Sequence, residues 1–105
     1  MIPVPDEVLA ALGYAYGVEA ASLRRFAGGE AYNDGVIYAG PIEGAERLLK
    51  ILAFPAAEAR QQHFCFEARL RFARYLGEHG ASIAFPRPSP QGRLYETHRT
   101  PDHLW

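Results

Sequence analysis

The chain has 105 residues, of which 49% are hydrophobic and 22% are charged, and its net charge at pH 7 is −1. This length and composition predict one globular domain with a hydrophobic core. The balanced charge and the pI of about 6.4 give no electrostatic reason to expect a nucleic acid or an anionic membrane as a partner.

Cysteine content and hydrophobic runs indicate the cellular compartment. Cys65 is the single cysteine, so an intramolecular disulfide is excluded, and the cysteine and histidine spacing predicts no metal site. The first residues carry no basic stretch, and no run of about 18 apolar residues occurs. We therefore expect a cytoplasmic protein without a signal peptide or a membrane span.

The first third of the chain predicts a short helix followed by a hairpin. Residues 6–12 have an acidic start and amphipathic spacing, and the helix should end near Gly13 or Gly17. Residues 22–26 and 36–39 are typical of two strands. The connection between them, 28–35, is rich in residues that tolerate positive φ angles.

The middle of the chain predicts a third strand and the one long helix. A turn at residues 40–44 leads into a strand over 47–54, which Pro55 ends. From residue 56 to 78, apolar side chains recur at helical spacing, and Gly80 should cap this helix.

The last part predicts a rigid connection and further strands. Residues 82–85 run into a cluster of prolines, 92–97 have the character of a strand, and 103–105 begin an apolar segment. The expected fold is α+β: an antiparallel sheet of about five strands with the long helix packed on it, plus the short N-terminal helix. We treat residues 1–105 as one domain.

Lys50 is the most informative residue, because it is the only lysine beside ten arginines. Alternation along its strand puts it on the same face as Leu48 and Leu52, with Leu49 and Ile51 on the other face. An ammonium group among apolar side chains must either extend to solvent or meet an anion. Both alternatives are open from the sequence.

Two neighbours favour the anion. The glycine-rich turn with Gly28 and Gly29 lies one strand earlier, and Glu67 lies on the long helix. A glycine-rich turn lets backbone amides approach phosphate oxygens, a strand lysine neutralises them, and a helix glutamate can hold that lysine.

The ordered set of motifs resembles the N-terminal lobe of the aminoglycoside phosphotransferase and choline kinase-like family. Residues 23–33 with 36–38 resemble its first hairpin, 48–51 its nucleotide-binding strand, and 66–69 the helix segment with its lysine-pairing glutamate. Residues 75–92 are similar to its helix end and proline-rich approach to the fourth strand.

This resemblance implies an ATP-binding lobe of a kinase that phosphorylates a small-molecule hydroxyl. Lys50 would contact the α- and β-phosphates, Glu67 would orient Lys50, and the turn with Gly28, Gly29 and Asn33 would cover the nucleotide. ATP and Mg²⁺ would be the cofactors. We expect the chain to be truncated before a C-terminal lobe that would choose the acceptor and bind the metal.

The aspartates of the chain bear on catalysis. They are Asp6, Asp34 and Asp102, and none lies in a loop like the catalytic loop of kinases. We therefore expect no catalytic residue in this chain and no phosphoryl transfer by this chain alone.

Plainer interpretations stay open beside this one. Glu67 can form helical i,i+4 pairs with Arg71 and His63, and the two glycines can serve only to shape a hairpin. Cys65 and the four histidines suit packing or surface positions. The competing hypothesis is a non-enzymatic α+β interaction module that self-associates, burying the face that would otherwise meet a second lobe.

Overall fold

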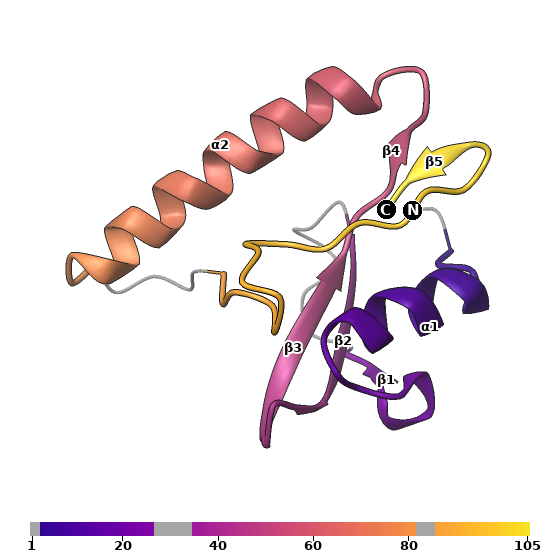
Figure 1. The fold of residues 1–105 in the computed structure, drawn as a ribbon, viewed down its shortest axis with the longest axis horizontal. Coiled ribbons are helices and arrows are strands. Elements are labelled where there is room, and N and C mark those ends of the chain that lie inside the picture. The colour runs from indigo at the N-terminus through magenta and orange to yellow at the C-terminus, as the bar shows by residue number, and fades with distance from the viewer. Residues whose placement is uncertain (1–2, 27–34, 82–85) are drawn as a thin grey trace.

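The three-stranded antiparallel sheet is the centre of the fold. A computed structural model describes residues 3–26, 35–81 and 86–105, and in it the strands β1 (Arg24–Arg25), β2 (Val36–Ile42) and β3 (Ala45–Ile51) lie in the order β1-β2-β3 (Figure 1). β3 therefore forms one edge of this sheet.

A two-residue turn sets the register of β2 and β3. Ile42 lies opposite Ala45, and the two residues between them, Glu43 and Gly44, have φ angles of 51° and 80°. Two positive φ angles define the tight hairpin turn whose twist matches that of the strands. The turn predicted at residues 40–44 is thus present, in a shorter form.

The core lies between the sheet and the first helix, α1 (Asp6–Ala15). Val8 and Leu12 of α1 join Leu49 and Ile51 of β3 and Trp105 in one buried cluster. α1 continues past Gly13 and ends before Gly17, whose φ of 75° suits a glycine at a helix end. A short 3-10 turn, η1 (Ala20–Ser22), leads from it towards β1.

The long helix α2 (Ala59–Glu78) ends as predicted. Gly80 has a φ of 90°, and the Ala81 N–H donates to the Leu76 carbonyl at 3.0 Å. This is the Schellman arrangement, in which a left-handed glycine lets the chain turn back on the last carbonyls.

A second, two-stranded sheet closes the fold. β4 (Phe54–Pro55) pairs antiparallel with β5 (His103–Leu104). Before β5, the turn at residues 89–96 is held together by Glu96, which accepts from the Ser89 hydroxyl at 2.6 Å and from Arg93 at 2.7 Å.

Three details differ from the sequence-based expectation. The single sheet of about five strands is wrong, because a three-stranded and a two-stranded sheet form instead. The strand predicted over 47–54 divides into β3 and β4, and 92–97 is irregular, since the bonds around Glu96 fold it into a turn.

The packing of the helices also differs. α1 covers the three-stranded sheet, whereas α2 contacts β4 and has only Ala59 fully buried (Figure 1). Charged side chains recur along α2, and this limits the apolar face that it can bury.

Gly40 offers a test of the sheet packing. A Cβ atom there would lie 2.7 Å from the Ser22 carbonyl oxygen and 2.9 Å from a methyl carbon of Leu23. We expect Gly40→Ala to lower the free energy of unfolding by about 1–3 kcal/mol, the usual cost of overpacking, measured by urea denaturation.

Gly92→Ala is the matched control. A Cβ at Gly92 meets nothing within 4 Å, so its cost comes from the φ of 79° alone, about 1 kcal/mol. If Gly40→Ala proves no more costly than a neutral surface change, β2 does not pack against residues 22–23 as described.

Candidate functional site

Lys50 lies on the face of β3 that points away from the core. Its strand neighbours Leu49 and Ile51 are buried, while Lys50 is exposed and Leu48 is 58% exposed. The alternation predicted from the sequence is therefore confirmed.

Lys50 borders a hollow that we call the β3 hollow. It has a volume of about 290 Å³ and lies between β3, α2 and the segment that follows α2. Its walls include Leu48 and Lys50 from β3, Phe66 and Leu70 from α2, and Arg87 and Tyr95. The hollow is thus the space across which α2 faces the edge strand.

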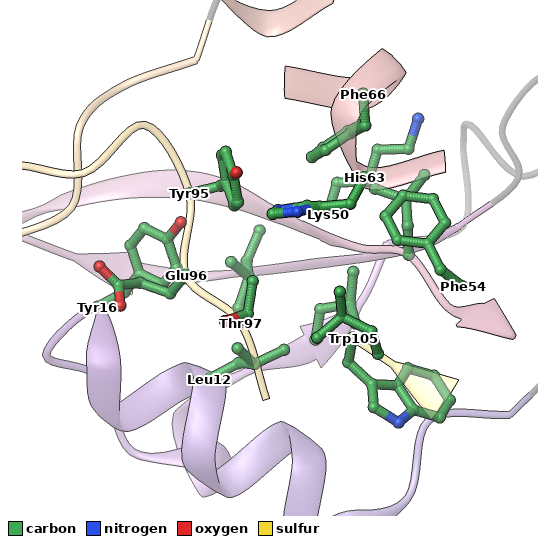
Figure 2. A pocket seen from close by; sticks show the side chains of 14 residues that line it. Leu12, Tyr16, Lys50, Phe54, His63, Phe66, Tyr95, Glu96, Thr97 and Trp105 are labelled. Carbon is green, nitrogen blue, oxygen red and sulfur yellow. The ribbon is translucent and has the colours of Figure 1, made fainter. Parts of the chain in front are cut away.

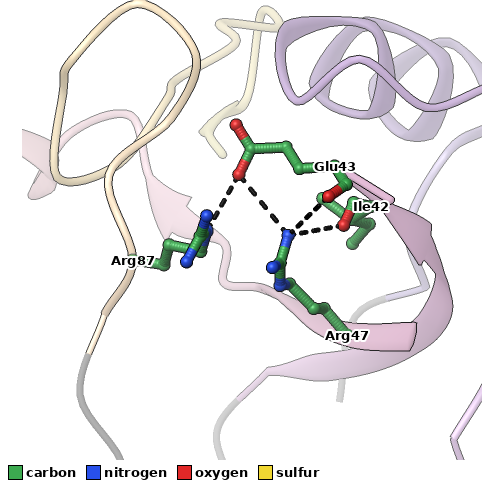
Figure 3. A network of polar contacts seen from close by, with 4 residues as sticks. All are labelled: Ile42, Glu43, Arg47 and Arg87. Atoms are coloured by element: carbon green, nitrogen blue, oxygen red, sulfur yellow. Dashed lines mark hydrogen bonds and ion pairs between the residues drawn. The ribbon is translucent and has the colours of Figure 1, made fainter. Parts of the chain in front are cut away.

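Charged side chains gather on the rim of the β3 hollow. Among the described residues that line it, Arg47, Lys50 and Arg87 are cations and Glu43 is the one carboxylate. Figure 3 shows how the carboxylate holds both arginines: Arg87 Nε donates to Glu43 Oε2 at 2.9 Å, and Arg47 Nη1 lies 3.6 Å from the same oxygen. The two arginines of this rim thus share one carboxylate.

Backbone carbonyls fix the position of Arg47. Its Nη1 donates to the Ile42 carbonyl at 2.7 Å and to the Glu43 carbonyl at 3.2 Å, across the β2–β3 turn. Because these acceptors belong to the tight turn, the position of the guanidinium is set by the hairpin itself. The arginine is a fixed part of the rim.

Aromatic rings form the inner wall, next to a smaller cavity of about 50 Å³ that has room for a few water molecules. Figure 2 shows Phe54, Phe66 and Tyr95 on one side of it, with Leu12 and Trp105 on the other. Phe66 lies with its ring centroid 5.6 Å from that of Phe54 and 5.7 Å from that of Tyr95. These edge-to-face contacts anchor the first half of α2.

His63 brings an unusual polar atom to this wall. Its ring lies edge-on to Tyr95 at 5.1 Å, and its Nε2 is buried and has no hydrogen-bond partner within the described part of the chain. A buried polar atom without a partner costs free energy. A water molecule in the adjoining cavity would supply that bond.

Glu67 lies on the far side of Tyr95. It lines a separate hollow of about 560 Å³ with His63, Arg71 and Tyr95, so Tyr95 borders the hollows of both Lys50 and Glu67. Its carboxylate accepts from Arg71 at 2.8 Å and 3.3 Å. This is the i,i+4 pair foreseen as the plainer interpretation.

These contacts shift the acidity of the two groups. The hydrogen bond from Arg71 holds the pKa of Glu67 below its usual value. Burial raises the pKa of Tyr95, and the nearby Glu67 carboxylate raises it further. Tyr95 therefore stays a neutral hydrogen-bond donor.

Two residues of the predicted nucleotide site, Lys50 and Glu67, are among the described residues. Gly28, Gly29 and Asn33 lie outside the described residues. Phe66 brings the helix turn that carries Glu67 to the wall of the β3 hollow. Among the contacts between described residues, the Glu67 carboxylate is engaged by Arg71.

Sequence reasoning missed Arg47, Arg87 and their shared partner Glu43. The tight turn at Glu43 and Gly44 was the available signal for Arg47, because it brings that arginine back over the turn carbonyls. Arg87 carried no signal, since its contact with Glu43 joins parts of the chain 44 residues apart.

Comparisons with protein families, curated proteins and solved structures found no match for this chain. Over the described ranges, no cluster of three or more histidine, cysteine, aspartate or glutamate side chains could hold a metal ion. In the same ranges, no helix has the length and apolar character needed to cross a membrane.

The Glu67–Arg71 pair predicts a pH dependence. Because the folded pKa of Glu67 is lowered, its contribution to stability is present above the ordinary glutamate pKa and is lost as the pH falls through the folded value. We expect Arg71→Gln to raise the pKa of Glu67, as measured by NMR titration of the side-chain carboxyl carbon.

Arg74→Gln is the control for that titration. Arg74 pairs with Glu78 at 2.7 Å in the same i,i+4 geometry and leaves Glu67 untouched. A Glu67 pKa that stays the same in Arg71→Gln would show that Arg71 does not hold this carboxylate in solution.

Proposed function

We propose that this chain is the nucleotide-binding lobe of a small-molecule phosphotransferase that uses ATP. The observation that carries the proposal is the pair of arginines, Arg47 and Arg87, that share one carboxylate on the rim of a hollow with aromatic walls. The single lysine of the chain, Lys50, lines the same hollow from its edge strand. The resemblance of the ordered motifs to a kinase-like lobe supports the same function.

Electrostatics supports an anionic ligand at the β3 hollow. Arg47 and Arg87 share one carboxylate. A phosphate chain beside them would supply a second anionic partner for the two guanidinium groups. Guanidinium and ammonium groups are the side chains that bind phosphate oxygens best, and Lys50 is a further cation on the same strand as Arg47.

Shape supports a nucleotide among anions. Tyr16 and Tyr95 line the same hollow, and aromatic rings are common stacking partners of bases. Its volume of about 290 Å³ is near the lower end of the range for small-molecule sites, about 300 Å³. A modest movement of α2 away from β3 would enlarge it.

Glu67 fits the proposal as a residue that can change partners. Its ion pair with Arg71 is on the surface, with the Arg71 side chain 69% exposed, and such pairs contribute little to stability. In kinases, the helix glutamate pairs with the strand lysine only in the assembled active state. We therefore propose that Glu67 exchanges Arg71 for Lys50 when nucleotide and the second lobe are in place.

The proposal covers nucleotide binding, and the chemistry needs further groups. Mg²⁺ would screen the phosphates and favour transfer of the γ-phosphoryl group, while Lys50 and Glu67 would position the nucleotide. We propose that the aspartates for Mg²⁺ and for the acceptor hydroxyl, and the choice of acceptor, come from a second lobe.

A reagent that delivers an acyl group from the phosphate end of ATP tests the site. Because Lys50 is the only lysine, an acyl-phosphate derivative of ATP has one side-chain amine to acylate. We expect Lys50 to be acylated at least tenfold faster by this derivative than by acetyl phosphate, and an excess of ATP to protect it. Peptide mass spectrometry measures both rates.

Matched variants separate binding from simple lysine reactivity. Arg87→Gln removes a rim cation and should slow acylation of Lys50 by the ATP derivative but not by acetyl phosphate. Arg99→Gln changes an exposed arginine away from the hollow and should leave both acylation rates unchanged. Equal rates for the two reagents, with no protection by ATP, would contradict the proposed function.

A further inference from the structure

The outer side of α2 carries a second apolar surface that the fold leaves uncovered. Phe64, Phe72 and Tyr75 are 73%, 63% and 56% exposed, and Ala68 between them is exposed as well. At about 100° per residue, these four side chains fall within an arc of about 80° on the helix. We call this surface the outer stripe.

The outer stripe is distinct from the side that α2 turns to its own domain. His63, Phe66 and Leu70 point to the hollows on the opposite side of the helix. A helix that is apolar on two opposite sides needs two partners, and the domain provides only one. Exposed aromatic side chains in a row are typical of a protein contact surface.

We propose that the outer stripe is a dimer interface in which α2 packs antiparallel against α2 of a second copy of this chain. The midpoint of the stripe lies between residues 69 and 70, and Phe64 and Tyr75 are equally far from it. In an antiparallel pair, Phe64 of each chain then lies level with Tyr75 of the other, and Ala68 allows close approach at the centre.

Charge complementarity selects this partner and this direction. In the antiparallel register, Arg60 lies within one residue of the level of the partner's Glu78, and Glu67 within one residue of the partner's Arg71. Both pairs lie along the same flank of the stripe and are exposed or half-exposed. In a parallel pair related by a two-fold axis along the helices, this flank would face the opposite flank of the partner, so neither of these pairs would form.

The exposed area indicates a dimer of moderate affinity. Three aromatic side chains of roughly 200 Å² each, at the exposures above, provide roughly 400 Å² of apolar surface per chain. With the charged flanks, the two chains would bury about 1,200 Å², the lower end of stable interfaces. Dimerisation should therefore depend on concentration in the micromolar range. This inference does not depend on nucleotide binding.

Sedimentation equilibrium of the full chain, from micromolar to millimolar concentration, tests the interface. We expect a monomer–dimer equilibrium, and we expect Phe72→Ser to raise the dissociation constant at least tenfold while circular dichroism stays unchanged. Leu48→Ser, a change of a similarly exposed apolar side chain on β3, is the control and should leave the dissociation constant unaltered. A monomer at all concentrations would overturn the proposal.

Charge reversal tests the antiparallel direction. Arg60→Glu and Glu78→Arg each place like charges together twice in a homodimer and should raise the dissociation constant roughly tenfold. Mixing the two variants should restore dimers. In the mixed dimer, one of the two pairs is the original Arg60–Glu78 pair and the other is the same pair with both charges reversed, so opposite charges meet at both places. Mixed samples that dimerise no better than the separate variants would overturn the antiparallel arrangement.

Discussion

The register of the β2–β3 hairpin is the constraint on which the rest of this structure depends. Glu43 and Gly44 both take positive φ angles, and the tight turn fixes which residues of β3 face α1. A slip of one residue would move Lys50 into the core and Leu49 out of it, since side chains alternate along a strand. The core, the charged rim and the exposed lysine therefore have one common origin.

That register also links stability to the candidate site. Arg47 donates to the carbonyls of the turn and contacts Glu43, which in turn holds Arg87 from a distant part of the chain. The groups that order the rim of the hollow are thus mostly backbone acceptors and one shared carboxylate. The shared carboxylate offsets the repulsion between the two arginines that it holds.

α2 buries fewer of its residues in the domain than α1 does. It is anchored by Phe66, whose ring meets Phe54 and Tyr95, and its second half extends away from the sheet (Figure 1). A helix held at one end can move relative to the strand across from it, which suits a site where Glu67 must reach a new partner. The same loose attachment leaves its outer side free for a second chain.

The sequence predicted local features better than long-range ones. The ends of both helices and the alternation around Lys50 follow from glycine conformation and period-two spacing, which act within a few residues. The division into two sheets could not be predicted, because it depends on Phe54 meeting Leu104 and on Glu96 folding residues 89–96 into a turn. The surroundings of Lys50 are likewise long-range, because they come from β3, α2 and the segment after α2.

Mapping of a nucleotide on the chain by NMR tests the central claim most directly. Titration of the ¹⁵N-labelled chain with Mg²⁺ and ATP should give saturable shifts that cluster at the end of β3 around Lys50, at Arg87 and at Tyr95, around the β3 hollow. Saturable shifts confined to other surfaces, such as the outer stripe, or no saturable shift at ATP concentrations well above those in cells, would contradict a nucleotide site at the β3 hollow.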